Sequence, residues 1–413
     1  MFIILIFSLV VSAIYSSKLR QSIAGANTLR SFVGAANPRL AGDRVSVIIP
    51  AYNEADNIHS CAIAVLNSTP LLEPPLSQEG ISSDLPSPQV EVLVVDDQST
   101  DETYALADYL QQNNGTERLK VIAGQTRPAG DTWVGKNWAC TQGAELAQGE
   151  FLLFIDADVR LKEGAIEKVI QIAQQEQIDL LSCAPALVCE CWAEWLVQPV
   201  MFNHLAVCFD FACVSDRNSE TTFASGQFML FRRSAYDKIG GHRAVAGEVV
   251  EDVELARRVK QAGLKLQYAP RPDIASVRMY RSWGALWEGW TKNLYLGAQR
   301  SVWLMVYLAF IMVMVYPVPW LGLALFLGKC FFSNLNLLDF LTIGLSLIGI
   351  WLQYNLRVEG AKISQCPPKY WWLSGMGGAL VAAIALASVI KTETGWGWTW
   401  RGRELKLPAV KEL

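Results

Sequence analysis

VEVLVVDDQSTDET, at residues 90–103, is the stretch that decides the fold. Its first part is rich in branched apolar residues, which is typical of a strand buried on both faces. Two adjacent carboxylates, Asp96 and Asp97, follow that strand, and the polar residues at 99–102 suit a helix cap and first turn. Capping does not account for the paired acids, so we expect one of them to face a crevice.

The same order of strand, polar turn and helix-like stretch recurs over residues 43–280. Three more runs rich in branched residues precede such turns: VSVII (45–49), LKVIA (119–123) and FLLFI (151–155). This alternation predicts an α/β fold with a mostly parallel sheet, in which ligands bind beyond the carboxyl ends of the strands. A Pro- and Ser-rich stretch at 68–89 is interpreted as a surface insertion.

Acidic residues also follow the fourth run and begin a later helix. Asp156 and Asp158 form a DxD pattern directly after FLLFI. Alternate residues of an extended chain point the same way, so the pair could hold one hard divalent cation; a turn with two solvated acids is the alternative. Glu251 and Asp252 crowd the start of the helix in GEVVEDVELARRVKQAG, where helix-dipole complementarity explains their charge but a general base is also possible.

GDTWVGKN, at residues 130–137, resembles a phosphate-binding loop without being one. Asn137 stands where a Ser or Thr should ligate Mg²⁺, and the loop does not directly follow its strand. We therefore do not predict an ATPase. Lys136 could still reach a phosphate as a point charge.

Composition restricts the partners and the compartment. Charged residues make up 18% of the 413 residues and hydrophobic ones 52%, so part of the chain is expected to lie in an apolar solvent. A net charge of −4 gives no basic field for a nucleic acid, and we exclude that partner. The nine Cys and three His lack zinc-site spacing, and free thiols fit a reducing compartment.

The apolar excess lies at the two ends of the chain. Residues 1–15 are uncharged and precede Lys18 and Arg20, which favours an N-terminal anchor at 1–17 over a cleaved signal peptide. Further uncharged runs at 302–328, 340–356 and 370–390 predict membrane helices.

Proline and loop charge bear on the topology. Pro317 and Pro319 split the run at 302–328, which is either one kinked span or a tight hairpin. Basic residues are more numerous after the last run than between the last two, which favours a cytoplasmic C-terminus at 391–413 and an even number of crossings after residue 300. The domain that follows the N-terminal anchor is then expected to face the cytoplasm.

Five motifs, in order and spacing, resemble glycosyltransferase family 2, whose inverting enzymes have the GT-A fold. They are VSVIIPAYNEADNI, EVLVVDDQSTDET, WVGKNWA, FIDADV and VVEDVELARRVKQAG. The match covers roughly residues 43–300, and the terminal GWGWTWRGRE is similar to the membrane-bound branch that includes hopanoid-associated and carotenoid glycosyltransferases. The Gln-x-x-Arg-Trp motif of processive synthases is absent at 299–303, which disfavours a polymerase.

The resemblance implies a Rossmann-like GT-A domain at 43–300, membrane helices at 301–390, a nucleotide-sugar donor and a divalent cation, Mg²⁺ or Mn²⁺. It implies these site residues: Pro50, Ala51, Tyr52 and Glu54 at the nucleotide, Asp97 at the nucleobase, Lys136 and Asp156 at the diphosphate, Asp158 at the metal ion and Asp252 as the base.

The flanking aromatic residues indicate the acceptor. Aromatic side chains at 192–211 and 283–290 suit helices at a bilayer interface, with core packing as the alternative. We therefore predict transfer to a hydroxyl of a lipid-like acceptor, such as a carotenoid or hopanoid. Transfer to a polyprenyl phosphate and a non-catalytic membrane scaffold remain open.

Overall fold

The computed structural model describes the chain except for residues 31–43, 70–88, 115–116, 129–132, 333 and 405–413. The predicted insertion at 68–89, apart from its ends, lies outside the described residues, as does the end of the predicted tail. The chain forms two compact units. A sheet unit contains Ala26–Ala186 and Ala212–Arg278, and a helical unit contains Met1–Gly25, Leu187–Phe211 and Met279–Leu407.

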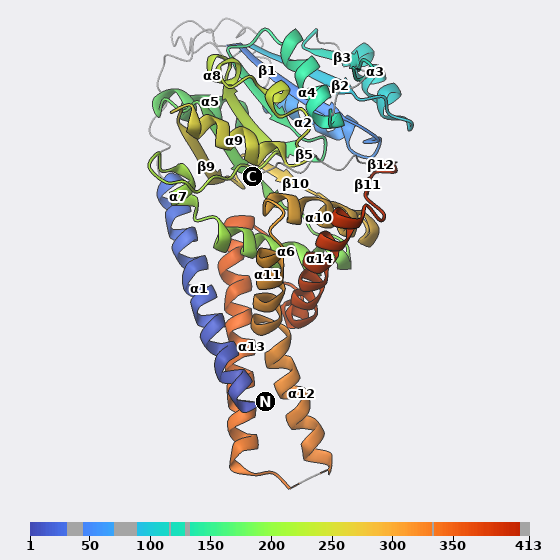
Figure 1. Ribbon diagram of the computed structural model, residues 1–413. Coiled ribbons are helices and arrows are strands. Elements are labelled where there is room, and N and C mark those ends of the chain that lie inside the picture. Colours follow the sequence, from blue (N-terminus) through green and yellow to red (C-terminus); the bar gives the residue numbers. More distant parts are fainter. Residues whose placement is uncertain (31–43, 70–88, 115–116, 129–132, 333, 405–413) are drawn as a thin grey trace, which may run out of the picture. The chain divides into compact units, whose positions relative to one another are not determined.

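The sheet unit is built on a seven-stranded sheet with the order β3-β2-β1-β4-β8-β6-β9 (Figure 1). Only β8 runs antiparallel to its neighbours, so the sheet is mostly parallel, as predicted. All five residues of β4 and of β6 are buried, which explains their unbroken apolar sequence. A smaller sheet has the order β5-β10-β7.

The elements of the sheet unit, with α7 and β7 at its boundaries, are β1 (Arg44–Ala51), α2 (Ile58–Ser68), β2 (Gln89–Asp96), α3 (Thr103–Asn113), β3 (Leu119–Ala123), α4 (Gly135–Leu146), β4 (Phe151–Ile155), β5 (Val159–Leu161), α5 (Ala165–Gln175), β6 (Leu180–Ala184), β7 (Ala186–Leu187), α7 (Phe211–Ser215), β8 (Phe228–Arg232), α8 (Arg233–Lys238), η1 (His242–Val245), α9 (Glu251–Gln261), β9 (Leu266–Pro270) and β10 (Ala275–Val277). The predicted strands at 45–49, 90–95, 119–123 and 151–155 all lie in this sheet.

Among the described residues, four helices are long and apolar enough to cross a membrane: Phe2–Ala26, Val302–Phe332, Leu337–Ser364 and Trp371–Thr394. Each apolar run predicted from the sequence lies in one of them. The elements of the helical unit are α1 (Phe2–Arg30, which continues past the unit boundary), α6 (Trp192–Cys208), α10 (Trp283–Gly297), α11 (Val302–Val315), α12 (Pro317–Phe332), α13 (Leu337–Ser364), η2 (Trp371–Leu373), α14 (Ser374–Thr394), β11 (Thr399–Trp400) and β12 (Arg403–Glu404).

The proline-split run at 302–328 forms one interrupted span rather than a hairpin. Helix α12 begins at Pro317, two residues after α11 ends. Prolines supply no backbone N–H, so the last carbonyls of α11 need other donors. Gln353 of α13 donates to the carbonyls of Val315 (3.0 Å) and Tyr316 (2.9 Å), and Ser8 of α1 donates to that of Met314 (2.6 Å). Side chains of neighbouring helices thus stabilise the interruption.

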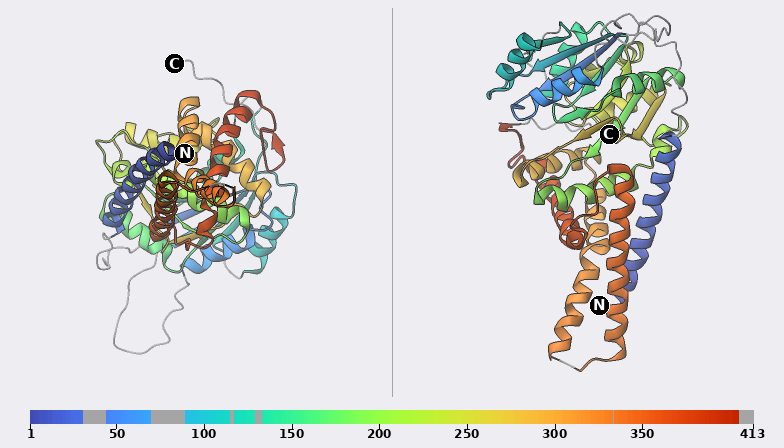
Figure 2. Two further views of the ribbon diagram at one scale, coloured as in Figure 1. Left: turned by 90° about the horizontal axis from the view of Figure 1, so that it is seen from below. Right: turned by 180° about the vertical axis from the view of Figure 1, so that it is seen from behind.

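Helix α14 runs beside α11 and not along the full length of the interrupted span. A Cβ on Gly378, near its start, would lie 2.3 Å from Tyr316, and Ser388, near its end, donates to the carbonyl of Thr291 in α10 (2.6 Å). Helix α14 therefore starts near the α11–α12 junction and ends beside α10. Helices α12 and α13 extend beyond it (Figures 1 and 2).

The aromatic residues predicted to lie at a bilayer interface divide between the surface and the interior of the helical unit. Trp192 and Trp283 are exposed. Trp290 is buried, and its indole N–H donates to Gln198 (2.7 Å). Core packing accounts for Trp290, whereas Trp192 and Trp283 have the exposure expected of interface residues.

Candidate active site

The loops that follow β1 and β2 lie together at the carboxyl edge of the sheet. The backbone N–H of Asp97 donates to the carbonyl of Ala51 (2.8 Å). Asn53, at a φ of 52°, donates through its N–H to the hydroxyl of Ser99 (3.0 Å), and the N–H of Glu54 donates to the hydroxyl of Thr103 (2.7 Å). The structure thus brings together the five residues predicted to bind the nucleotide, which are Pro50, Ala51, Tyr52, Glu54 and Asp97.

Asp97 has an ionic partner that the sequence did not reveal. Arg127, which follows β3, lies 2.8 Å from the Asp97 carboxylate, and the Asp97 side chain is only 5% exposed. Gly124 allows the loop after β3 to come close, because a Cβ there would lie 2.4 Å from the carbonyl oxygen of Asp96. The position of Arg127 after the third parallel strand could have indicated this partner, since the first three strands all end at the same edge of the sheet.

Lys136 lies at the centre of a charged cluster. It is in the first turn of α4, and its Nζ lies 2.7 Å from Asp156 and 2.8 Å from Glu251. The same ammonium donates to the carbonyl of Gly226 (3.4 Å), which occupies the third of its three donor positions. Within the segment that resembles a phosphate-binding loop, Lys136 therefore contacts three separate segments of the site, which the sequence did not indicate.

Asp252 is held beside this cluster. Its Oδ2 accepts from the N–H of Gly226 (2.7 Å), and its Oδ1 accepts from the N–H of Val253 (2.8 Å). Burial and the neighbouring negative charge of Glu251 raise the pKa of Asp252 to about 6, although Lys136 and the two N–H donors oppose them. For Glu251, burial is outweighed by Lys136, so its pKa is lowered. The two adjacent acids therefore differ in basicity.

Gly226, just before β8, is where the backbone approaches this cluster most closely. A Cβ there would lie 2.9 Å from Lys136, 3.1 Å from Asp252 and 3.2 Å from Glu251. Farther along the chain, Gly241 has a φ of 51°, and a Cβ there would lie 2.4 Å from the ring of Tyr236.

Asp156 and Asp158 lie in a turn, which differs from the extended geometry that the sequence argument assumed. The N–H of Val159 donates to the carbonyl of Asp156 (3.0 Å), closing the turn directly after β4. The two carboxylates therefore do not share a direction by alternation. Among the described residues, no three His, Cys, Asp or Glu side chains are arranged to hold a metal ion.

Two buried thiols, of Cys140 and Cys61, lie close enough to several site residues to be affected by their charges. The charges of Lys136, Glu251, Asp156 and Asp97 all act on the thiol of Cys140, whose pKa burial raises. Asp158, Glu54 and Asp156 act in the same way on Cys61, whose pKa is also raised by burial. The nucleotide loops, the Asp156–Asp158 turn and the start of α9 therefore surround one region.

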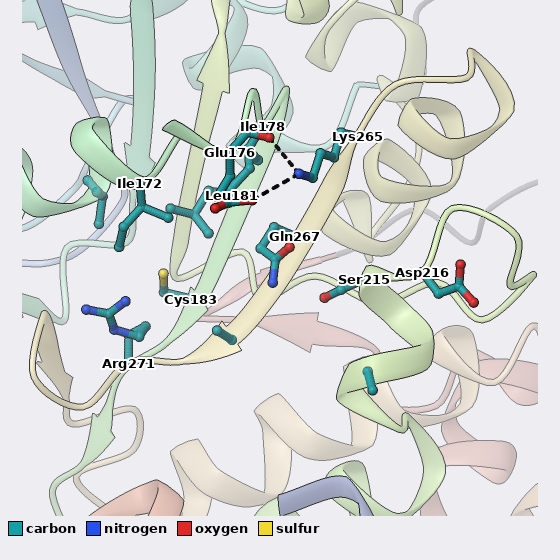
Figure 3. A pocket seen from close by; sticks show the side chains of 13 residues that line it. Ile172, Glu176, Ile178, Leu181, Cys183, Ser215, Asp216, Lys265, Gln267 and Arg271 are labelled. Carbon is teal, nitrogen blue, oxygen red and sulfur yellow. Dashed lines mark hydrogen bonds and ion pairs between the residues drawn. The ribbon is translucent and has the colours of Figure 1, made fainter. Parts of the chain in front are cut away.

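A separate cavity of about 270 Å³ lies elsewhere in the sheet unit (Figure 3). Its walls come from α5, β6, β9 and the chain around α7, and Arg271 and the Glu176–Lys265 ion pair line it. The residues lining it include none of the candidate site residues, so this cavity and the charged site are distinct.

Comparison with protein families gives the class of this protein. Residues 46–240 match Glycosyl transferase family 2, and residues 151–386, more than half of the chain, match Glycosyl transferase family group 2. The chain belongs to glycosyltransferase family 2, as its motifs predicted.

The chain is similar to two curated relatives that carry the name 4,4'-diaponeurosporenoate glycosyltransferase. The one from Staphylococcus haemolyticus (strain JCSC1435) is 30% identical over 268 residues, which are 62% of each chain. The one from Staphylococcus aureus (strain MRSA252) is 28% identical over 258 residues, which are 62% of this chain and 61% of that protein. The matched region thus spans about three fifths of the length of these relatives.

Solved structures support the GT-A fold. The mannosyltransferase PcManGT from Pyrobaculum calidifontis, in complex with GDP-Man and Mn²⁺, superposes with a TM-score of 0.55 at 15% identity, covering 94% of this chain and 98% of that one. The predicted fold class, a GT-A domain with an N-terminal apolar helix and C-terminal apolar helices, is confirmed.

Proposed function

We propose that this protein is a membrane-bound, inverting glycosyltransferase that moves a sugar from a nucleotide-sugar donor to a hydroxyl of a lipid-like acceptor, such as a carotenoid or hopanoid. The observation that carries the proposal is the Asp252 carboxylate, whose pKa is raised to about 6 within a charged cluster at the carboxyl edge of a GT-A sheet. The family and the apolar helices support it, and the name of the curated relatives supports a carotenoid-like acceptor without favouring a hydroxyl.

The donor nucleotide binds at the loops after β1 and β2. Tyr52 and Glu54 line its pocket, and Asp97 accepts from the base. Because Arg127 already occupies one oxygen of Asp97, nucleotide binding uses the other oxygen or displaces Arg127. The basic Arg127 and the acidic Asp97 therefore form one recognition pair.

The residues around Asp158 fit a hard divalent cation. Carboxylates are the hard oxygen ligands that Mg²⁺ and Mn²⁺ prefer, and Mg²⁺ is commonly held by one or two carboxylates together with substrate phosphates. Asp158 provides such a ligand, whereas Asp156 is already compensated by Lys136 at 2.7 Å. The bound ion would offset the negative charge that develops on the departing diphosphate.

Asp252 performs the proton transfer. Its two backbone donors fix the orientation of the carboxylate while leaving lone pairs on both oxygens. One oxygen accepts the proton of the acceptor hydroxyl as that hydroxyl attacks the anomeric carbon in line with the leaving diphosphate. A single displacement inverts that carbon and requires no covalent intermediate. Lys136 keeps Glu251 ionised, and the charge of Glu251 keeps Asp252 basic.

Replacing Asp252 by Asn tests this assignment, because the side chain keeps its shape and loses its basicity. We expect sugar-nucleotide affinity to stay within a few-fold and kcat to fall by about 10²- to 10⁴-fold. The comparison variant Asp97→Asn should weaken nucleotide binding first. If Asp252→Asn instead raises KM for the donor with kcat unchanged, Asp252 is a binding residue.

A carboxylate acceptor is the second candidate, favoured by the name of the relatives, since a diaponeurosporenoate carries a carboxylate. Such a group is ionised at neutral pH and needs no general base. With a polyene carboxylate as acceptor, Asp252→Asn should then retain most of its kcat. The same variant therefore distinguishes the two acceptor classes.

The helical unit supports a proposal for the membrane topology. We infer two full crossings after residue 300, by α11–α12 together and by α13, because α14 starts near the α11–α12 junction and ends beside α10. This arrangement keeps the even number of crossings that a cytoplasmic C-terminus requires. It also puts the basic residues at 357–369 on the same side as those of the tail, which agrees with the positive-inside rule.

A further inference from the structure

Arg357 of α13 is a buried cation outside the candidate active site. It is 4% exposed and donates to the carbonyl oxygens of Lys369 (3.0 Å) and Trp195 (3.5 Å). Among the described residues, no carboxylate lies within 4.0 Å of its guanidinium. A buried charge that lacks an ionic partner is costly, and in a membrane protein it commonly marks a function.

Two buried thiols lie beside this arginine. The Sγ atoms of Cys189 and Cys366 are 3.7 Å apart, in hydrogen-bonding contact, although the residues are 177 positions apart in the chain. Both thiols are free, and their residues are 9% and 3% exposed. The charge of Arg357 acts on both. This is the only pair of cysteine sulfurs within 4.0 Å in the described part of the chain.

Local structure holds each thiol in place. Cys366 follows the end of α13, where Gln365 has a φ of 55° and the chain reverses direction. The N–H of Cys366 then donates to the hydroxyl of Ser364 (3.2 Å). Cys189 lies two residues before Cys191, the N-cap of α6, and Glu194 of that helix accepts from the N–H of Glu190 (2.6 Å). The sulfurs therefore meet because two helix ends are fixed, and only a small movement separates them from bonding distance.

We propose that Cys189 and Cys366 form a reversible disulfide bond on reaction with a hydroperoxide, with Cys366 as the attacking thiolate and Cys189 as the resolving thiol. The Cys366 thiolate attacks one peroxide oxygen, which breaks the O–O bond and gives a sulfenic acid and hydroxide. The Cys189 sulfur then attacks the Cys366 sulfur and releases water. Overall, two thiols lose two electrons and two protons, and one peroxide becomes two molecules of water.

The electrostatics assign the two roles. The hydrogen-bonding contact with Cys189 lowers the pKa of Cys366, burial opposes this, and the charge of Arg357 lowers it further. The pKa of Cys189 is raised, first by its hydrogen bond to Cys366 and then by burial. A positively charged neighbour is what activates a thiol toward peroxide. Arg357 therefore acts through Cys366 as a positioning residue.

The experiment treats the full-length protein, reduced and then freed of reductant, with hydrogen peroxide. Peptide mapping without reduction should find Cys189 joined to Cys366, with a mass loss of 2 Da per molecule that dithiothreitol reverses. The exposed cysteines Cys208 and Cys330 are first replaced by Ser, so that accessible thiols do not compete. Failure to recover the joined peptide from the folded protein would overturn the proposal.

Two sets of variants test the roles. Arg357→Met should raise the pKa of Cys366 and slow disulfide formation about tenfold, since a rise of one pKa unit lowers the thiolate fraction by about that factor. The control variant Lys362→Met, at an exposed lysine of the same helix, should not slow it. Cys189→Ser should leave a sulfenic acid on Cys366 that dimedone captures, and Cys366→Ser should leave Cys189 unreactive. Both single-cysteine variants keep Arg357, so their comparison does not depend on removing a buried charge. Equal reactivity of the two single cysteines would refute the assigned roles.

Discussion

Removing the two charges next to Asp252 should shift the pH dependence of transfer in opposite directions. A general base must be ionised, so kcat/KM rises with pH through the pKa of Asp252, which is about 6. Glu251→Gln removes a negative charge that raises this pKa, so the rise of kcat/KM on the acid side of the pH profile, its acid limb, should move to lower pH. Lys136→Met removes a positive charge that lowers it, so the limb should move to higher pH.

Coulomb's law gives the order of magnitude of the shift. Two unit charges about 6 Å apart interact by roughly 3 kcal/mol at an effective dielectric constant of about 20, which corresponds to about two pKa units. The Lys136 side chain is 29% exposed, so water screens part of this interaction. We therefore expect each limb to move by on the order of one pH unit.

The assay measures kcat/KM from pH 4.5 to 9 in membranes supplied with labelled sugar nucleotide. The pH at which kcat/KM rises does not depend on the maximum value of kcat/KM. A loss of donor affinity in Lys136→Met therefore does not obscure the shift. Arg243→Met, at an exposed arginine paired with Glu145, serves as the control and should leave the limb unchanged. Shifts of both site variants in the same direction would refute this electrostatic account of Asp252.

Three further predictions concern other parts of the molecule. Gly226→Ala places a methyl group 2.9 Å from the Lys136 ammonium, so we expect kcat to fall at least tenfold while the protein stays folded, measured by transfer and thermal unfolding together. Asp158→Asn and excess chelator should each abolish transfer, measured with labelled donor, and full activity in chelator would remove the metal from the mechanism. Gln353→Leu leaves two carbonyls of the interrupted helix without donors and should lower the free energy of unfolding by about 1–3 kcal/mol, measured in detergent.

Each of the two structural variants has a matched control. At Gly284 an added Cβ would meet nothing within 4 Å, so Gly284→Ala should keep full activity. Asn355 is half-buried on the same helix as Gln353, and its side chain donates to the carbonyl of Trp351 in that helix (3.0 Å), so Asn355→Leu should change stability less than Gln353→Leu. If Gly284→Ala were as inactive as Gly226→Ala, crowding of the charged cluster would not be the cause.

The sequence predicted the sheet and its binding edge because buried parallel strands have unbroken apolar sequences that end in polar turns. The run FLLFI, for example, is entirely buried, and Asp156 follows it at the expected edge. The prediction that Asp156 and Asp158 lie in extended chain was wrong, because strand pairing ends at Ile155. The backbone then closes a turn, and the alternation of side chains that holds within a strand no longer applies.

Contacts between distant segments could not be read from the sequence. The pairing of Lys136 with Glu251 depends on where α4 and α9 meet, and neither helix carries a local pattern that names its partner. The partial depth of α14 escaped prediction for a similar reason. Hydropathy counts apolar residues, whereas the depth of a helix depends on its neighbours, here Tyr316 at one end and Thr291 at the other.

The charge balance of the site links these observations to the mechanism. The ammonium of Lys136 pairs with the carboxylates of Asp156 and Glu251, and its charge also acts on the adjacent carboxylate of Asp252. A nucleoside diphosphate would add further negative charge to this region, and like charges at short distance cost free energy. Donor binding is therefore expected to require an additional cation, for which Asp158 is the proposed ligand. The charge of Glu251, which raises the pKa of Asp252, thus also adds to the negative charge that a divalent ion would offset, so donor affinity should fall on chelation even when no sugar is transferred.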